Sequence, residues 1–199
     1  CTSEIIVVDS GSTDRTVQIA KELGARVAFR AWDNDFSAQR NFALAQTRAK
    51  WVLFLDADER PTSALAEAIR QATSASAPER KYRLERRTVA FGITFKHGVL
   101  KPDSVCRLFP RTAITWVNKV HERPECALPE AGLPGYLEHH TYSGWSDWER
   151  KLCLYTTIWA EDAYDTGRRT SVSGAVLHGF GGLFKMLFLR LGFLDGPMG

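Results

Sequence analysis

Short apolar runs that end abruptly in polar residues organise the first half of the chain. Residues 4–9 (EIIVVD) and residues 51–58 (WVLFLDAD) are two such runs, and each ends in aspartate. Runs of this length favour buried strands and are too short to span a membrane. An apolar stripe of helical period follows the first run and stops at Gly24. Residues 26–30 then alternate as a short strand, and Ser37 can cap the next helix.

This alternation of strands and helices predicts an α/β protein with a mostly parallel sheet and crossover helices on its faces. A further helix, over residues 62–73, follows the second apolar run. In such sheets, ligands bind outside the carboxyl ends of the strands. Three carboxylates are expected at these ends, those of Asp9, Asp56 and Asp58. We therefore expect the functional site there.

The pattern changes after the polar linker at residues 73–80. Short alternating segments separated by Gly and Pro predict a small, mostly antiparallel addition to the sheet. These segments are residues 82–86, 91–95, 105–109 and 114–117. A capping box at Ser146 predicts a helix that ends near Gly167. We therefore divide the chain into residues 1–76, 77–145 and 146–199.

The last apolar stretch, Phe180 to Leu194, has helical period. Lys185 and Arg190 interrupt it, which argues against a membrane span. Packing of this stripe against the domain and insertion into a membrane interface remain equally open.

Composition narrows the class of protein. The 199 residues are 44% hydrophobic and 25% charged, which is ordinary for a globular protein and argues against disorder. A net charge of +3 does not indicate nucleic acid as a partner, but it suits an anionic substrate or an anionic membrane surface. The four cysteines form no Cys-x-x-Cys pair. This spacing argues against a zinc site and fits free thiols in a reducing compartment, while a secreted protein with an even cysteine count stays open.

The candidate chemistry is concentrated in Asp56-Ala57-Asp58. Side chains alternate along a strand, so Asp56 and Asp58 emerge on the same side. Two neighbouring carboxylates repel each other unless a cation lies between them. Oxygen ligands of this kind suit Mg²⁺ or Mn²⁺ that also holds a phosphate. The alternative is a solvated turn that leads into the next helix at Pro61.

Three motifs together resemble the inverting glycosyltransferases of family 2, which have the GT-A (Rossmann-like) fold. They are residues 6–14 (IVVDSGSTD), 39–43 (QRNFA) and 56–59 (DADE). Later segments are similar to bacterial lipopolysaccharide-core glucosyltransferases. These segments are Pro102-Asp103 with Arg107-Leu108-Phe109, Val120-His121-Glu122, Leu137-Glu138-His139 and residues 192–196 (GFLDG). The resemblance covers nearly the whole chain in the family's order.

The resemblance implies an activity and a place in the cell. The expected reaction moves a sugar, glucose, from a nucleotide sugar, a UDP-sugar, to a saccharide acceptor in the lipopolysaccharide core or another lipid-linked glycan. Residues 1–76 would bind the nucleotide sugar, residues 77–145 would form the acceptor side, and residues 146–199 would be a helical region that contacts the membrane. The enzyme would be cytoplasmic, with peripheral contact at the inner face of the cell membrane, and would have no nucleic-acid partner.

The resemblance also implies roles for individual residues. Asp9 would contact the nucleotide base or ribose, and Arg40 would lie near the nucleotide. For its neighbour Asn41, a solvated helix face is an equal interpretation. Asp56 and Asp58 would bind Mg²⁺ or Mn²⁺ that bridges the donor diphosphate. Asp56 would therefore contribute both to metal binding and to nucleotide-sugar binding.

A histidine is a further candidate ligand of this cation. The Leu-Glu-His motif favours His139, although His140 stands where the family has an aromatic residue. Family members also begin with an apolar strand and an Asn-Glu loop that completes the base pocket, and this chain lacks both. We therefore expect a fragment without its N-terminal strand and helix, with weakened donor binding.

An inverting transfer needs one carboxylate to take the proton from the acceptor hydroxyl. Glu122 is the candidate, and Asp103 is its rival. An exposed Glu122 paired with Lys119 or Arg123 is the alternative without catalytic function.

Two other classes of protein compete with a glycosyltransferase. A phosphohydrolase could use the first Asp of Asp-x-Asp as a nucleophile. However, Arg60 occupies the position at which the motif of such enzymes has Thr or Val. A non-catalytic nucleotide-binding module is the third possibility, and retention of Asp56, Asp58 and Glu122 together speaks against it.

Overall fold

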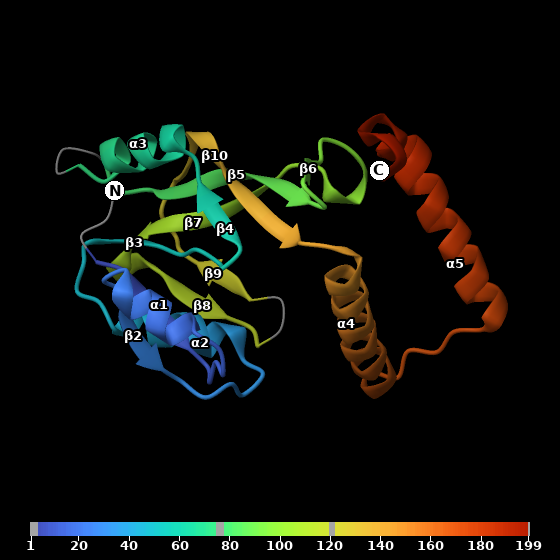
Figure 1. Ribbon diagram of the computed structural model, residues 1–199, viewed down its shortest axis with the longest axis horizontal. Coiled ribbons are helices and arrows are strands. Elements are labelled where there is room, and N and C mark those ends of the chain that lie inside the picture. The colour runs from blue at the N-terminus through green and yellow to red at the C-terminus, as the bar shows by residue number, and fades with distance from the viewer. Residues whose placement is uncertain (1–3, 75–77, 120–121, 199) are drawn as a thin grey trace. The chain divides into compact units, whose positions relative to one another are not determined.

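Alternating strands and helices build the first half of the computed structural model, and antiparallel strands and long helices build the second (Figure 1). The structure describes residues 4–74, 78–119 and 122–198. Its residues group into two units. The first unit comprises Cys1–Leu55, Ser63–Leu84 and Val105–Gly135, and the second comprises Asp56–Thr62, Glu85–Ser104 and Tyr136–Gly199. The predicted boundary at residue 76 lies outside the described residues.

The helices are α1 (Thr16–Glu22), α2 (Phe36–Ala45), α3 (Ser63–Ala72), α4 (Trp145–Asp165) and α5 (Val172–Phe184). A π-helical turn, η3 (Lys185–Leu189), continues α5, and short 3₁₀ segments are η1 (Gly98–Leu100), η2 (Arg111–Ala113) and η4 (Gly192–Met198). The strands are β1 (Ile6–Asp9), β2 (Arg26–Phe29), β3 (Trp51–Leu53), β4 (Glu59–Pro61), β5 (Lys81–Ala90), β6 (Ile93–Thr94), β7 (Asp103–Pro110), β8 (Thr115–Val117), β9 (Arg123–Glu125) and β10 (Glu130–Tyr142). The predicted α/β class is confirmed, and the arrangement is consistent with the GT-A fold.

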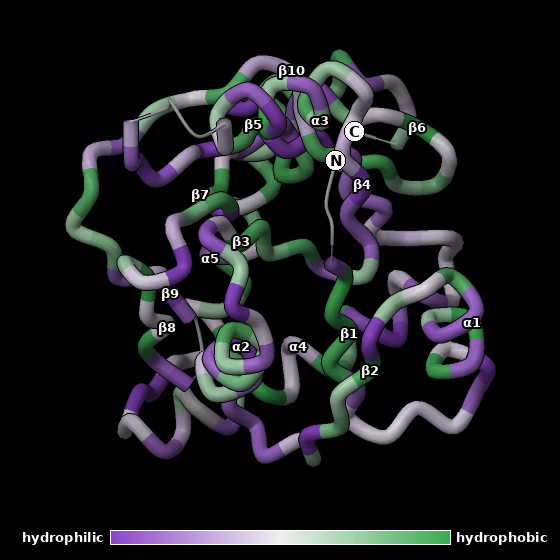
Figure 2. Tube along the Cα trace, turned by 90° about the vertical axis from the view of Figure 1, so that its left-hand side faces the viewer, coloured by the Kyte–Doolittle hydropathy of each residue, from purple (hydrophilic) through white to green (hydrophobic). Residues whose placement is uncertain are grey.

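A β-α-β repeat opens the first unit, as the alternation predicts. β1 and β2 pair in parallel with Ile6 opposite Arg26, and α1 connects them. The helix ends where Gly24 adopts a left-handed φ of 82°, a conformation that glycine adopts without steric cost. Figure 2 shows the apolar β1 running beside β2. Asp9, at the end of β1, lies at a strand's carboxyl end as predicted.

The second apolar run has a different partner from the one that the alternation predicts. β3 pairs with β7 in antiparallel fashion, with Val52 opposite Phe109. The larger sheet has the strand order β3-β7-β5-β10-β4, with β6 beside β5, while β1 and β2 form a sheet of their own. Asp9 and Asp56 therefore follow strands of two different sheets.

Aromatic packing forms the core around this strand pair. Phe54, Phe109, Ile114 and Trp116 are buried together. The Phe54 and Trp116 ring centroids are 5.1 Å apart in an edge-to-face arrangement, which favours the ring quadrupoles. Phe54, the residue after β3, is thus held in an apolar core of the first unit.

Two predicted helix caps are wrong by one or two residues. Asp35, not Ser37, caps α2, because its side chain accepts the Ala38 N–H at 2.8 Å. Ser37 is buried inside the first turn and donates its hydroxyl to the Asn118 carbonyl at 2.5 Å. In the same way, α4 begins at Trp145, ahead of the predicted cap Ser146. Ser37 therefore makes a tertiary hydrogen bond in place of the predicted cap, and Ser146 lies inside α4 rather than before it.

The apolar stripe of the C-terminal segment is exposed in the structure. Phe180, Leu183, Phe184 and Phe188 are each between 48% and 67% exposed. Val172–Leu189 is also long and apolar enough to cross a membrane by length and composition, and none of that window is buried. The stripe therefore does not pack against the described residues, so the interpretation as a core helix is not borne out.

Helix α3 packs directly on the backbone of β10 at Gly135, which has a φ of 85°. A Cβ atom added there would lie 2.4 Å from the Leu65 backbone nitrogen and 2.7 Å from its Cα. Because Leu65 is fully buried in α3, neither partner has room to move. Only glycine satisfies both the conformation and the close approach.

We predict that Gly135→Ala lowers the free energy of unfolding by about 2–5 kcal/mol, through left-handed strain and overpacking against α3. Urea unfolding followed by tryptophan fluorescence measures the change. Gly132→Ala is the matched control, because it lies in the same strand with no neighbour within 4 Å of the added Cβ. Equal urea midpoints for the two variants would contradict the packing argument.

Candidate active site

In the first unit, the Asp9 carboxylate organises the loop that follows β1. It accepts the Gly11 N–H at 2.9 Å and the Ser12 N–H at 3.2 Å, and the Ser12 hydroxyl donates to its other oxygen. The Ser12 hydroxyl, followed by the Gly11 amide, lowers the pKa of Asp9 below its ordinary value. Asp9 is thus a buried, ionised carboxylate that shapes the loop, and its contact with a nucleotide stays a prediction.

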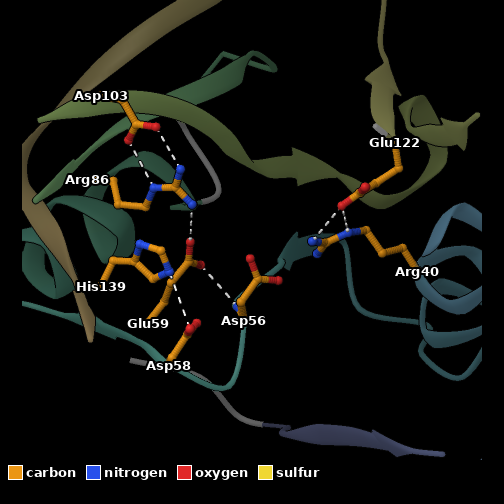
Figure 3. Close-up of polar contacts among 8 residues, drawn as sticks. All are labelled: Arg40, Asp56, Asp58, Glu59, Arg86, Asp103, Glu122 and His139. Atoms are coloured by element: carbon orange, nitrogen blue, oxygen red, sulfur yellow. Dashed lines mark hydrogen bonds and ion pairs between the residues drawn. The ribbon is translucent and has the colours of Figure 1, made fainter. Parts of the chain in front are cut away.

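The predicted residues Arg40 and Glu122 are brought together in the first unit. The Arg40 guanidinium donates to a Glu122 carboxylate oxygen at 3.1 Å, and it lies over the Trp116 ring, 4.7 Å from the centroid (Figure 3). Both side chains are mostly buried, with 14% and 21% of their surface exposed. Glu122 is therefore paired with Arg40 rather than with Lys119 or Arg123, and Arg123 instead contacts Glu125 at 3.0 Å. Val120 and His121, which precede Glu122 in its motif, lie outside the described residues.

The Asn41 side chain is bound to the backbone of β8, so it is not part of a solvated helix face. Its side-chain amide donates to the Trp116 carbonyl at 2.8 Å, and its side-chain carbonyl accepts the Trp116 N–H at 3.0 Å. This pair of hydrogen bonds joins α2 to β8 along the edge where a further strand would otherwise pair. The Lys119 carbonyl also accepts the Phe36 N–H at 3.1 Å. The chain that leads to Glu122 is therefore held against α2.

In the second unit, a buried glutamate organises the Asp-x-Asp turn. The Glu59 side chain is 0% exposed, and it accepts the Asp56 N–H at 3.1 Å. Its other oxygen accepts a hydrogen bond from Arg86 at 3.2 Å. Arg86 also donates to both oxygens of Asp103, at 2.9 and 2.7 Å (Figure 3). Asp103, followed by Glu59, raises the pKa of Arg86 above its ordinary value, so this cation is permanent.

His139 lies beside Asp58, as the metal prediction requires. Its Nε2 atom is 3.3 Å from Asp58 Oδ2, and this hydrogen bond lowers the pKa of Asp58. The His140 ring points to Glu138 instead, at 3.4 Å, while its backbone N–H donates to the Asp58 carbonyl at 2.8 Å. Of the two histidines, His139 is the one whose ring contacts the Asp-x-Asp residues.

The donor atoms around Asp58 have the right chemistry for a divalent cation. An ionised carboxylate and an imidazole nitrogen lie together, and Asp56 supplies a second carboxylate on the same turn. Among the described residues, no group of three or more His, Cys, Asp or Glu side chains converges closely enough to hold a metal. The turn thus provides side chains of the type that binds a divalent cation.

Three residues of the site carry roles that the sequence does not indicate: Glu59, Arg86 and Asn41. Glu59 stands next to Asp58, yet nothing in the pattern shows that its side chain turns inward. Arg86 has the same parity in β5 as the buried Tyr82 and Leu84, so it stands on the apolar face of an alternating strand. A charged residue on that face was the available signal, and only the fold reveals its partners.

Comparison with known proteins agrees with this geometry. The sequence model of glycosyl transferase family 2 matches residues 2–88. Over its whole length, the chain is 28% identical to an uncharacterized glycosyltransferase of Rickettsia conorii and covers 74% of that protein. It is also 27% identical, over 98% of its length, to the lipopolysaccharide core biosynthesis glycosyltransferase LpsC of Rhizobium meliloti, of which it covers 73%.

A further relative has a higher sequence identity, but over a much shorter stretch of the chain. Over 56 residues, or 28% of this chain, it is 54% identical to a TPR repeat-containing protein of Synechococcus elongatus, and the match spans 14% of that protein. The chain thus corresponds to only part of each of these relatives. Residues 2–88 thus match glycosyl transferase family 2, and the chain is similar over nearly its whole length to proteins named as glycosyltransferases.

Proposed function

We propose that the protein is a metal-dependent inverting glycosyltransferase. It would move a hexose, glucose, from a UDP-sugar to a saccharide acceptor of the lipopolysaccharide core or another lipid-linked glycan. The Asp-x-Asp turn, with Asp58 hydrogen-bonded to His139 and Asp56 anchored through Glu59, is the observation that carries the proposal. The family match favours this function over a phosphohydrolase or a non-catalytic module. LpsC, named for lipopolysaccharide core biosynthesis, supports the class of acceptor.

Asp56, Asp58 and His139 would hold Mg²⁺ or Mn²⁺ together with the donor diphosphate. The bound cation would neutralise negative charge that develops on the leaving nucleotide diphosphate. The buried Glu59 keeps the backbone of Asp56 in place, so that the two carboxylates need little reorganisation on binding. Asp9 and Arg40 would contact the nucleotide part of the donor.

Glu122 would take the proton from the acceptor hydroxyl as this oxygen attacks the anomeric carbon. Its hydrogen bonds with Arg40 orient the carboxylate, and one-fifth of its side-chain surface is accessible. Asp103, the rival base, has both oxygens occupied by Arg86 and would have to break a bidentate pair before accepting a proton. This difference supports Glu122.

The exposed C-terminal stripe supports peripheral contact with the inner face of the cell membrane. Between Asp165 and Asp195 the chain has four Arg or Lys residues and no acidic residue. A helix that is apolar and exposed, with cations at its ends, suits the interface of an anionic bilayer. A lipid-linked acceptor would then lie at the same surface as the enzyme.

We predict that Asp56→Asn and Asp58→Asn each weaken Mn²⁺-dependent UDP binding at least tenfold while leaving the fold intact, because each removes a charged oxygen ligand. Calorimetric titration with UDP, with and without Mn²⁺, measures the effect. The circular dichroism spectra serve as the control for folding. Unchanged Mn²⁺-dependent affinity in both variants would refute the metal assignment and, with it, the proposed donor site.

We predict that Glu122→Gln lowers the transfer rate by about 10²–10⁴-fold without weakening UDP binding, since the amide preserves shape but cannot accept the proton. Release of UDP from a UDP-sugar in the presence of a core-oligosaccharide acceptor measures turnover. Asp103→Asn is the comparison that tests the rival base. Normal turnover of the Glu122→Gln protein would exclude Glu122 as the base.

We predict that the protein floats with liposomes that contain anionic phosphatidylglycerol and not with phosphatidylcholine alone. Each basic residue close to the surface contributes on the order of 1 kcal/mol. Phe180→Glu combined with Phe184→Glu should abolish flotation, whereas Leu23→Glu, at an exposed apolar position that caps the C-terminus of α1, should not. Equal flotation of all variants would remove the support for membrane contact.

A further inference from the structure

A hollow of about 380 Å³ lies within the second unit, and His139, a proposed ligand of the cation, is part of its lining. Its described lining includes Arg86 of β5, Lys101 after η1, Asp103 at the start of β7, His139 of β10, and Arg190 after η3. The size is within the range of pockets that bind small molecules, and it accommodates a sugar ring with one substituent.

The hollow has an excess of positive charge. Asp103 is the carboxylate of the described lining, and both of its oxygens are bound by Arg86. Lys101 and Arg190 have no ion pair with any of the described residues, so their charges are uncompensated. Uncompensated cations at a concave surface concentrate anions, because low-dielectric walls focus the field.

A buried carboxylate fixes the position of Arg190. Asp195, with 6% of its side chain exposed, accepts the Lys96 N–H at 2.9 Å and the His97 N–H at 2.6 Å, and its other oxygen is 2.9 Å from His97 Nδ1. Although burial alone would raise the pKa of Asp195, these hydrogen bonds from His97 and Lys96 lower it. The Arg190 carbonyl also accepts the Gly98 N–H at 2.9 Å. The segment after η3 is therefore fastened to the wall of the hollow.

His139 connects the hollow to the Asp-x-Asp turn. The ring lines the hollow and contacts Asp58 through Nε2 at 3.3 Å. A ligand in the hollow would thus lie one side chain away from Asp58. In the proposed function the donor diphosphate is held through Asp56 and Asp58, so the anion that Lys101 and Arg190 attract belongs to another molecule.

We propose that this hollow is an acceptor subsite and that Lys101 and Arg190 bind a phosphate or carboxylate group carried by the acceptor saccharide. The inference rests on the proposed function and restricts its acceptor to an acidic sugar. Thr88 and Thr141, which also line the hollow, supply hydroxyl groups for neutral parts of the same sugar. Charge-assisted hydrogen bonds to a cationic pair provide most of the selectivity.

The test uses glucose 6-phosphate, glucose and inorganic phosphate as probes of the full chain, in EDTA so that no metal site contributes. We expect saturable calorimetric binding of glucose 6-phosphate, weaker binding of phosphate, and none of glucose. Lys101→Ala and Arg190→Ala should each weaken glucose 6-phosphate binding about tenfold, the effect of losing one hydrogen bond to a charged group. Arg168→Ala, which removes an exposed cation of the same unit outside the lining, should leave the affinity unchanged.

Two results would overturn the acceptor subsite. One is the absence of glucose 6-phosphate binding, or binding that both Lys101→Ala and Arg190→Ala leave unchanged. The other is displacement of glucose 6-phosphate by UDP with Mn²⁺, which would assign the hollow to the donor. Since Lys101 is exposed, its variant tests the site even if Arg190→Ala perturbs folding. Failure of the proposed function is measured separately, by Mn²⁺-dependent UDP binding in the Asp56→Asn and Asp58→Asn variants.

Discussion

A fully buried carboxylate holds the functional part of the second unit together. Glu59 accepts the backbone N–H of Asp56 through one oxygen and the guanidinium of Arg86 through the other. Leaving one member of such a pair without its partner costs about 3–5 kcal/mol, because an uncompensated charge would remain buried. The turn between Asp56 and Glu59 is therefore tied to β5, and through Asp103 to β7. Asp56 and Asp58 take their positions from this network rather than from their own strand.

In the first unit, a neutral amide side chain has a comparable structural role, because it also forms hydrogen bonds to backbone groups. Asn41 satisfies both backbone groups of Trp116, while Arg40, its neighbour in sequence, stacks on the Trp116 ring and pairs with Glu122. Buried polar groups are costly unless they are hydrogen-bonded, so each of these contacts strongly favours a single arrangement. Of these two adjacent residues of α2, Asn41 thus holds β8 and Arg40 orients Glu122, the candidate base.

Polar residues near the C-terminus extend this organisation to the hollow that we propose as an acceptor subsite. Asp195 fastens its segment to the loop at Lys96 and His97, and this contact places Arg190 in the wall of the hollow beside Lys101. The apolar stripe that precedes it stays exposed. One segment would therefore serve two surfaces, a lipid-facing stripe and an anion-binding wall, which suits transfer to an acidic sugar that is linked to lipid.

The amino-acid sequence by itself determined the α/β class, the β1–α1–β2 repeat and the importance of the Asp-x-Asp turn. These features are local, because periodicity, a glycine stop and strand-end carboxylates are all contained in a few neighbouring residues. It also singled out His139, whose ring the structure places 3.3 Å from Asp58.

The tertiary structure alone decided which strands pair and which charges meet. β3 pairs with β7, a strand that is distant along the chain, because apolar complementarity and not sequence order selects the partner. The cap at Asp35, the inward turn of Glu59 and the pairing of Arg40 with Glu122 likewise depend on groups that are distant in sequence. Side-chain pairing of this kind follows from the free energy of the whole fold, since a buried polar atom must find whichever partner the packing brings near.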